Sequence, residues 1–185
     1  MTRTLLLTAL IAAQLACSLA CSQPTPEVAS AQPAKPAPEP VPLPPNASAQ
    51  AKLVDAYLRV SDRLASDDAK GAAGAAAKAA EAAGSVEGQQ PAQIKAAAAE
   101  IAAASDIEKQ RAAFERASNA LIGFVESAGN PMASIVYVAR CPMAFDNRGA
   151  RWLQGSAAIR NPYFGASMLT CGSIEAQYAP GARKP

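Results

Sequence analysis

The chain has 185 residues, 50% of them hydrophobic, and its formal net charge at pH 7 is +2. This length allows one domain of ordinary size with a packed core, and so small a charge excludes the dense basic face of a nucleic-acid-binding protein. Because the sequence contains no histidine, it also excludes catalysis by Ser-His-Asp or Cys-His groups and every histidine-containing zinc site.

Residues 1–20 have the pattern of an export signal. Arg3 precedes an apolar stretch at 5–15 that is too short to span a bilayer. A cysteine then follows Leu-Ala twice, at Cys17 and at Cys21. This ending resembles the lipobox of bacterial lipoproteins, in which the cysteine becomes the diacylated N-terminus. We expect an exported protein of the periplasm or cell envelope, anchored to the membrane by lipid on Cys21. The alternative is ordinary cleavage after Ala20, which leaves a soluble protein.

Residues 21–48 form a predicted tether. Nine of the chain's 15 prolines fall within 22–48, among Ala, Glu, Gln and Ser and with almost no large apolar side chains. Such a segment cannot bury enough surface to offset its ordering entropy, and it favours polyproline II. We expect it to act as a spacer between the membrane and a folded domain. The alternative is a Pro-rich ligand for a partner domain.

Helical periodicity begins after Asn46 and Ser48, which are both good N-cap residues. It predicts a first helix over 49–65 and a second, Ala-rich helix that begins after Ser66-Asp67-Asp68 and ends at Gly84. The residues expected to face inward on these helices are Leu53, Tyr57, Val60, Leu64, Ala72, Ala76, Ala80 and Ala83.

Two further helices are predicted before residue 131. The third begins at Pro91, since proline suits the first turn of a helix. The fourth begins with the capping box Ser105-Asp106-Ile107-Glu108 and stops at Gly129-Asn130-Pro131. The residues expected to face inward are Ile94, Ala97, Ala98, Ile101, Ile107, Phe114, Leu121, Phe124 and Val125. Four antiparallel helices joined by short turns favour an up-down bundle.

The pattern changes at residue 134. Residues 134–139 are β-branched and aromatic, which predicts a strand, and a loop-rich subdomain is expected over 134–174. The aromatic residues expected to join it to the bundle are Phe145, Trp152, Tyr163 and Phe164. The whole domain is predicted to span 49–178, with a disordered tail at 179–185. The fold class is therefore mainly α: an up-down four-helix bundle with a small C-terminal β/loop subdomain.

Four sulfur-bearing residues lie in this subdomain: Cys141, Met143, Met168 and Cys171. Thiolates and thioethers are soft donors that suit Cu(I) or Ag(I), and the spacings C-x-M and M-x-x-C would let each arm present two sulfurs to one ion. The arginines expected to favour the thiolate form are Arg140, Arg148, Arg151 and Arg160. The alternative is a structural disulfide between Cys141 and Cys171 with both methionines in the core, because paired cysteines usually bond in an oxidising compartment.

Over about residues 50–176 the chain resembles the DUF3347-type domain of bacterial envelope proteins. The specific elements are Cys141-Pro142-Met143 and Asn161-Pro162-Tyr163-Phe164-Gly165. The helical part agrees at Tyr57-Leu58, Ser61-Asp62, Leu64, Asp67-Asp68, Arg111, Phe114 and Ser118. Domains of this type also occur fused to periplasmic adaptor subunits of heavy-metal efflux pumps, so the resemblance implies a metal-efflux component as partner. One departure is Arg140, where many members have a histidine.

These observations predict a non-enzymatic envelope protein that binds copper or silver or assists metal efflux. The alternative is a structural or protein-interaction lipoprotein with a permanent Cys141–Cys171 disulfide and no metal role. Asp67-Asp68 is interpreted as helix capping rather than as an acid/base pair. An enzyme ranks third, because the sequence offers no general base, activated nucleophile or cofactor loop, and no small-molecule substrate is expected.

Overall fold

Helix α1 (Ala49–Ala65) is the first helix of the computed structural model, which describes residues 42–185. Ser48 caps it by accepting a hydrogen bond from Ala51 N at 3.1 Å. The four apolar residues predicted to face inward are buried, namely Leu53, Tyr57, Val60 and Leu64. The predicted first helix is therefore confirmed. The predicted signal peptide, Cys21 and most of the predicted tether lie outside the described residues.

Helices α2 (Ala69–Gly84) and α3 (Gln89–Ala103) follow. Asp68 caps α2, as predicted, by accepting from Gly71 N at 2.7 Å. The buried face of α2 consists of Ala72, Ala76, Ala79 and Ala83, so Ala79 takes the inward place predicted for Ala80. Helix α3 begins two residues before Pro91, and all four of its predicted inward residues are buried. Alanine faces let these helices approach closely.

Helix α4 (Ile107–Ala128) begins with a different cap from the one predicted. The cap is Asp106, whose Oδ1 accepts from Glu108 N at 2.7 Å and from Lys109 N at 3.2 Å, so the capping box centred on Ser105 is wrong. A carboxylate is a strong acceptor for the exposed amides of a first turn. The Glu108 side chain is thereby left to pair with Arg111, at 2.6 Å. The helix ends at Gly129, as predicted.

A three-stranded antiparallel sheet follows the helices, with strand order β2-β1-β3. Strand β1 (Val136–Cys141) confirms the strand predicted from residue 134, whereas β2 (Ala150–Gln154) and β3 (Ser173–Tyr178) were not predicted. In the register, Arg140 lies opposite Arg151 on one side and Ser173 on the other. Strand β2 has five residues that are buried almost throughout, so its sequence lacks the alternation that identifies a strand. Strand β3 does alternate polar and apolar residues from Ser173 to Tyr178, and this signal was missed.

Two short segments connect the strands. The segment α5 (Ala144–Asn147) is a single turn in which Phe145 and Asp146 have left-handed backbone angles, with φ of 52° and 56°. A short 3-10 helix, η1 (Gly165–Met168), lies before β3. Left-handed angles at residues other than glycine cost roughly 1–2 kcal/mol each, so tertiary contacts must hold this turn.

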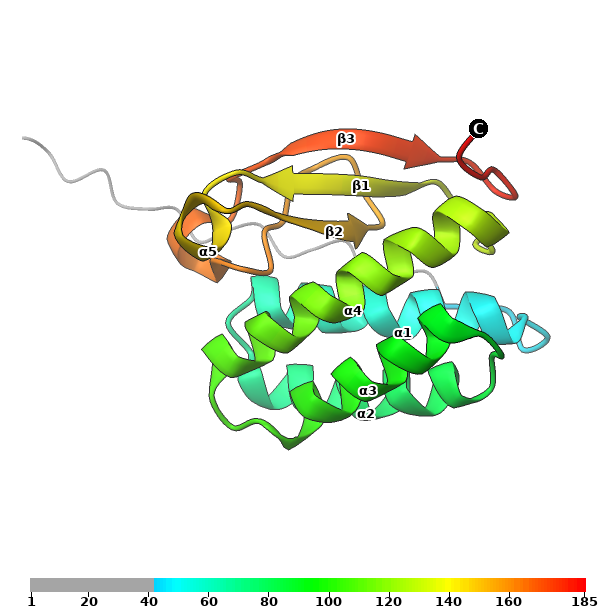
Figure 1. Ribbon diagram of the computed structural model, residues 1–185, viewed down its shortest axis with the longest axis horizontal. Helices are drawn as coiled ribbons and strands as arrows, with labels where there is room; N and C mark the ends of the chain where they lie inside the picture. The colour runs from blue at the N-terminus through cyan, green and yellow to red at the C-terminus, as the bar shows by residue number, and fades with distance from the viewer. Residues whose placement is uncertain (1–41) are drawn as a thin grey trace, which may run out of the picture. The chain divides into compact units, whose positions relative to one another are not determined.

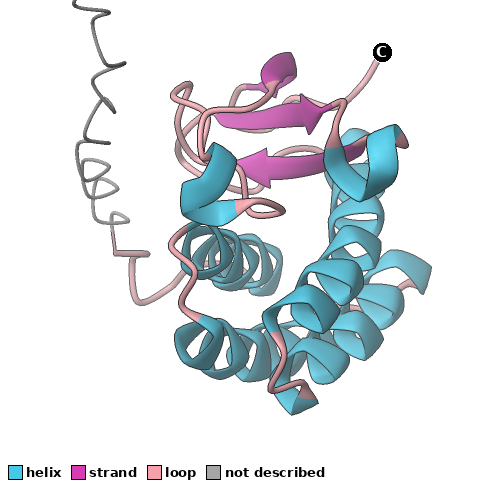
Figure 2. Ribbon diagram, turned by 90° about the vertical axis from the view of Figure 1, so that its left-hand side faces the viewer, coloured by secondary structure: helices cyan, strands magenta, loops and turns pink. Residues whose placement is uncertain are grey.

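The elements form three layers (Figure 1): the sheet, then α1 and α4, then α2 and α3 on the side away from the sheet. Helices that are consecutive in the chain pack against each other, but α1 and α4 make few contacts. Strand β2 packs on both α4 and α1, so the sheet covers the open side of the bundle (Figure 2). The mainly helical bundle with a small C-terminal β subdomain is therefore confirmed, and the bundle is closed by β2.

The C-terminal residues are held by the end of α4. Asn130 N donates to Ala182 O at 2.9 Å, Gly181 N donates to Asn130 O at 2.8 Å, and Lys184 N donates to Glu126 O at 3.0 Å. The segment predicted as a disordered tail thus makes backbone hydrogen bonds to the folded domain. Among residues 42–185, no helix has the length and apolar character needed to cross a membrane.

Candidate functional site

The two cysteines of the C-terminal subdomain meet at one end of the sheet. Cys141 is the last residue of β1, the central strand, and its side chain is completely buried. Cys171 lies two residues before β3 and is half-buried. Their Sγ atoms are 2.9 Å apart. The structure therefore brings together two residues that are 30 positions apart in the chain.

Gly172 explains how the chain reaches this position. Its φ is +137°, and a Cβ atom added to it would lie 2.8 Å from Arg140 O and 3.0 Å from Trp152 Cη2. Only glycine allows the backbone next to Cys171 to pass so close to β1 and to the buried indole ring. The Cys141–Cys171 pair is thus positioned by backbone packing against the sheet.

The two methionines of the predicted sulfur set differ from the cysteines in their surroundings. Met143 is 48% exposed and lies in the turn after β1. Met168 is half-buried at the end of η1. Neither is a fully buried core residue. Within residues 42–185, no group of three or more cysteine and carboxylate side chains is placed to hold a metal ion.

The protonation of Cys171 differs from the expectation that nearby arginines favour the thiolate. The contact with Cys141, together with partial burial, raises the pKa of the Cys171 thiol to about 11. The arginines are instead engaged with carboxylates: Arg148 with Glu115, Arg151 with Glu126 and Glu175, Arg140 with Glu175, and Arg160 with Asp62. At neutral pH the Cys171 thiol of the reduced protein therefore holds its proton, contrary to the prediction.

The separation of 2.9 Å between the sulfurs lies between two chemical states. A disulfide bond is about 2.05 Å long. Two thiolates at about 2.3 Å from one tetrahedral ion, the usual Zn–S distance, would lie roughly 3.8 Å apart. Either state requires a shift of about 1 Å. The distance alone permits both, and the burial of Cys141 favours the bond between the sulfurs, since an ion would need a path to it.

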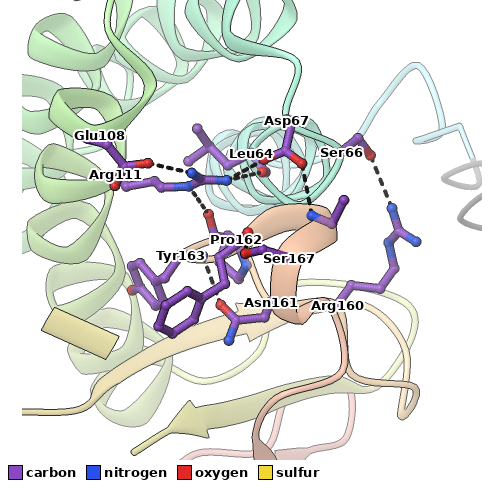
Figure 3. Close-up of polar contacts among 12 residues, drawn as sticks. Leu64, Ser66, Asp67, Glu108, Arg111, Arg160, Asn161, Pro162, Tyr163 and Ser167 are labelled. Atoms are coloured by element: carbon purple, nitrogen blue, oxygen red, sulfur yellow. Dashed lines mark hydrogen bonds and ion pairs between the residues drawn. The ribbon is translucent and has the colours of Figure 1, made fainter. Parts of the chain in front are cut away.

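The Asn-Pro-Tyr-Phe-Gly segment fastens the long loop before β3 to the bundle (Figure 3). The buried Arg111 of α4 donates from Nε to Pro162 O at 3.0 Å and from Nη2 to Asp67 Oδ1 at 2.6 Å. The other oxygen of Asp67 accepts from Ala166 N at 2.8 Å. We call Asp67, Arg111 and residues 161–166 the loop clamp. Of the two acidic residues interpreted as helix caps, only Asp68 caps α2, and Asp67 belongs to the clamp.

Two small details make the clamp possible. Gly165 has φ +57°, and a Cβ atom there would lie 1.9 Å from Asp67 Oδ1. Asn161 accepts from Tyr163 N at 2.8 Å and donates from Nδ2 to Cys171 O at 2.8 Å. The Asn161 side chain therefore connects the loop clamp to the backbone of Cys171. The Asn-Pro-Tyr-Phe-Gly motif, which is distinctive in the sequence, thus has a structural role.

Tyrosine hydroxyls form hydrogen bonds with backbone groups on the edge of β2 that faces away from β1. Leu153 N donates to Tyr57 OH at 3.3 Å, and Tyr163 OH donates to Arg151 O at 2.6 Å. Ser118 Oγ of α4 lies 2.6 Å from Tyr57 OH and 3.3 Å from Tyr163 OH. Burial raises the pKa of both tyrosines well above the ordinary value, so the hydroxyls remain protonated.

An aromatic cluster surrounds these hydroxyls. The rings of Tyr57 and Phe114 stack at 4.9 Å, and Tyr163 packs against Phe114, Phe145 and Trp152. This confirms that Phe145, Trp152 and Tyr163 join the C-terminal part to the bundle, and Phe164 packs at the periphery of the same core. Sequence reasoning missed the hydroxyl network, because the partners come from three distant segments and follow no spacing rule.

Comparison with known proteins identifies the family of the helical part. Residues 53–133 match the family model DUF3347, described as a protein of unknown function. No curated protein matches the chain, and no solved structure does. The match covers α1 to α4 and includes Asp67 and Arg111, but it ends before Cys141 and the Asn161–Gly165 segment. Residues 53–133 are therefore similar to the DUF3347 family, which supports the resemblance seen in the sequence.

Proposed function

We propose that this chain is a non-enzymatic module of the cell envelope whose Cys141 and Cys171 form a structural disulfide, and whose bundle docks on a partner protein. The observation that carries the proposal is the meeting of the two sulfurs at 2.9 Å, with Cys141 completely buried. Cysteines placed in this way bond in an oxidising compartment. The bond would close a loop that contains β2 and residues 161–166 of the loop clamp, and it would contribute about 4 kcal/mol of stability.

The export and anchoring of the chain are part of this proposal. Arg3, the apolar stretch at 5–15 and the Leu-Ala-Cys sequence ending at Cys21 support it. We expect the mature protein to begin at a diacylated Cys21, with the Pro-rich segment as a spacer. Mass spectrometry of the native N-terminus tests this. An unmodified N-terminus would remove the anchor, and a retained N-terminal segment would remove export.

The disulfide is tested by counting thiols on protein taken directly from the envelope. Free thiols are blocked during lysis, and Cys141 and Cys171 peptides are then examined. We expect neither cysteine to carry the blocking group. In addition, Cys141→Ser, Cys171→Ser and the double variant should each lose the same 2–5 kcal/mol or so of unfolding free energy, because one bond is lost in all three. Additive losses, or blocked thiols in the native protein, would contradict the disulfide.

The second candidate function is soft-metal binding, with Cu(I) or Ag(I) bound by the two cysteines and by Met143 or Met168. The observation that favours it is that Cys171 is half-buried and that Met143, two residues after Cys141 in the chain, is exposed, so soft donors are within reach of solvent. A copper- or silver-efflux component would then be the partner. This candidate requires the cysteines to be reduced and to release their protons on binding.

Anaerobic Cu(I) titration of the reduced protein against a chelator separates the two candidates. If metal binding is the function, one Cu(I) should be retained, Cys141→Ser and Cys171→Ser should each abolish retention, and Met143→Leu or Met168→Leu should weaken it less. Met132→Leu is the matched control and should leave copper retention unchanged, since Met132 lies outside the sulfur set, whereas Cys171→Ser marks complete loss. Release of all copper to a weak chelator by well-folded, reduced protein would remove the metal candidate.

A further inference from the structure

We propose that Cys171 is the cysteine through which the pair exchanges with external thiols and disulfides, and that Cys141 acts only on Cys171. This inference rests on the proposed disulfide and adds the order of its chemistry. It makes the expected redox partner an envelope oxidoreductase that carries a reactive dithiol or disulfide. The two cysteines are thereby assigned different chemical tasks.

The asymmetry of the pair carries the inference. Cys141 is the end of the central strand, where Ala150 of β2 lies opposite it, and its side chain has no exposed surface. Cys171 is half-buried between the exposed residues Thr170 and Ser173. Thiol–disulfide exchange requires direct approach of one sulfur to another, so access decides which sulfur is attacked. An external sulfur can approach Cys171 and cannot approach Cys141 in the folded protein.

The resulting oxidation has two balanced steps. The Cys171 thiol loses its proton to solvent, and its thiolate attacks an external disulfide; a mixed disulfide forms at Cys171, and the external partner leaves as a thiolate that takes up a proton. Cys141, with its sulfur already 2.9 Å away, then loses its proton and attacks Cys171 Sγ. The internal disulfide forms, and the second external thiolate is released. Overall, two protein thiols are oxidised and one external disulfide is reduced to two thiols.

The same geometry sets the course of reduction. An external thiolate attacks Cys171 Sγ, the internal bond breaks, and Cys141 leaves as a thiolate that takes up a proton. A second external thiolate then attacks the external sulfur of the mixed disulfide, and Cys171 leaves as a thiolate that takes up a proton, so two external thiols become one disulfide. Because Asn161 Nδ2 donates to Cys171 O and Cys171 N donates to Met168 O at 3.0 Å, the backbone at the attacked residue is held in place. Exchange therefore needs no unfolding of the sheet.

The test uses the reduced full chain with Cys17→Ser and Cys21→Ser in every sample, so that Cys141 and Cys171 are its only thiols. Glutathione disulfide is the probe, and adducts are followed by mass spectrometry with peptide mapping. We expect Cys141→Ala to accumulate an adduct at Cys171. Cys171→Ala should react at least about tenfold more slowly in native buffer, and the two variants should react at similar rates in denaturant. The otherwise unchanged pair should proceed to the internal disulfide without accumulating an adduct.

Equal native rates for the two variants, or first modification at Cys141, would overturn the inference. If either variant fails to fold, the same question is answered on the reduced pair itself, by limited alkylation and mapping of the first cysteine labelled. The outcomes separate the two proposals. Blocked thiols in protein from the envelope contradict the disulfide while leaving the preference for Cys171 to be measured. A native disulfide with Cys141 reacting first contradicts the order of exchange alone.

Discussion

Arg111 and Asp67 connect α4 to the turn between α1 and α2, with Nη2 of the arginine 2.6 Å from Oδ1 of the carboxylate. The guanidinium is almost fully buried, with 7% of the side chain exposed, whereas Asp67 is 44% exposed. Arg111 also donates to Leu64 O near the end of α1 and to Pro162 O. One side chain therefore joins the end of α1 and the turn after it to the loop before β3. The pair therefore holds the loop clamp as a unit.

Replacing Arg111 by Met should lower the free energy of unfolding by about 2–4 kcal/mol, because several buried acceptors lose their donor at once. Asp67 has a left-handed backbone, with φ of 56°. Asparagine tolerates this conformation, so Asp67→Asn should cost roughly 1 kcal/mol. Arg116→Met is the matched control. Its guanidinium is exposed on the same helix, α4, and pairs with Glu100 of α3, and the expected change is below about 1 kcal/mol. Urea unfolding measures all three, and equal losses at Arg111 and Arg116 would contradict the clamp.

The hydroxyl of Tyr57 should stabilise the junction between β2 and the bundle. Tyr57→Phe leaves Leu153 N without its acceptor in a buried place and removes the contact with Ser118 Oγ. We expect a loss of about 1–3 kcal/mol with the ring packing unchanged. Tyr137→Phe on β1, where the side chain is half-buried, should change stability by less than about 0.5 kcal/mol. Thermal unfolding of the two variants makes the comparison, and similar midpoints would show that the hydroxyl does not matter.

Two glycines should respond in opposite directions to the same substitution. A Cβ atom at Gly74, within α2, would meet nothing within 4 Å, so Gly74→Ala should raise stability by about 0.5–1 kcal/mol. Gly165→Ala should lower it by about 2–4 kcal/mol, because the backbone is left-handed and Asp67 occupies the space. Chemical denaturation gives both signs, and a tolerated Gly165→Ala would mean that the clamp adjusts easily.

The cap of α4 should make stability depend on pH. Hydrogen bonds from Lys109 N and Glu108 N lower the pKa of Asp106. A lowered pKa in the folded state means that this stabilisation is present above the unfolded pKa and is lost as pH falls through the folded pKa. The stability difference between the native sequence and Asp106→Ala should therefore shrink in acid. Asp106→Asn, a neutral cap, should lack this dependence. A difference that stays constant from neutral to acidic pH would contradict the charged cap.

The four helices and their inward faces were predictable because each depends on local periodicity and capping. Leu53, Tyr57, Val60 and Leu64 repeat at helical spacing, and Gly129 marks an end that no other residue type suits as well. Even here the choice between neighbouring caps was not determined, since Ser105 and Asp106 are both good caps and only the packed helix selects one.

The pairing of β3 with β1, the pairing of Cys141 with Cys171 and the loop clamp were decided by tertiary structure. Each joins segments far apart in the chain, and spacing along a sequence carries no information about which distant residues meet. The sequence alone identified the sulfur residues and the Asn-Pro-Tyr-Phe-Gly element as distinctive. Only the fold shows that β1 and Gly172 bring two of the four sulfurs into contact. It also shows that the buried Arg111 binds the backbone carbonyl of Pro162 in this element, a contact that a pattern of side chains in the sequence does not reveal.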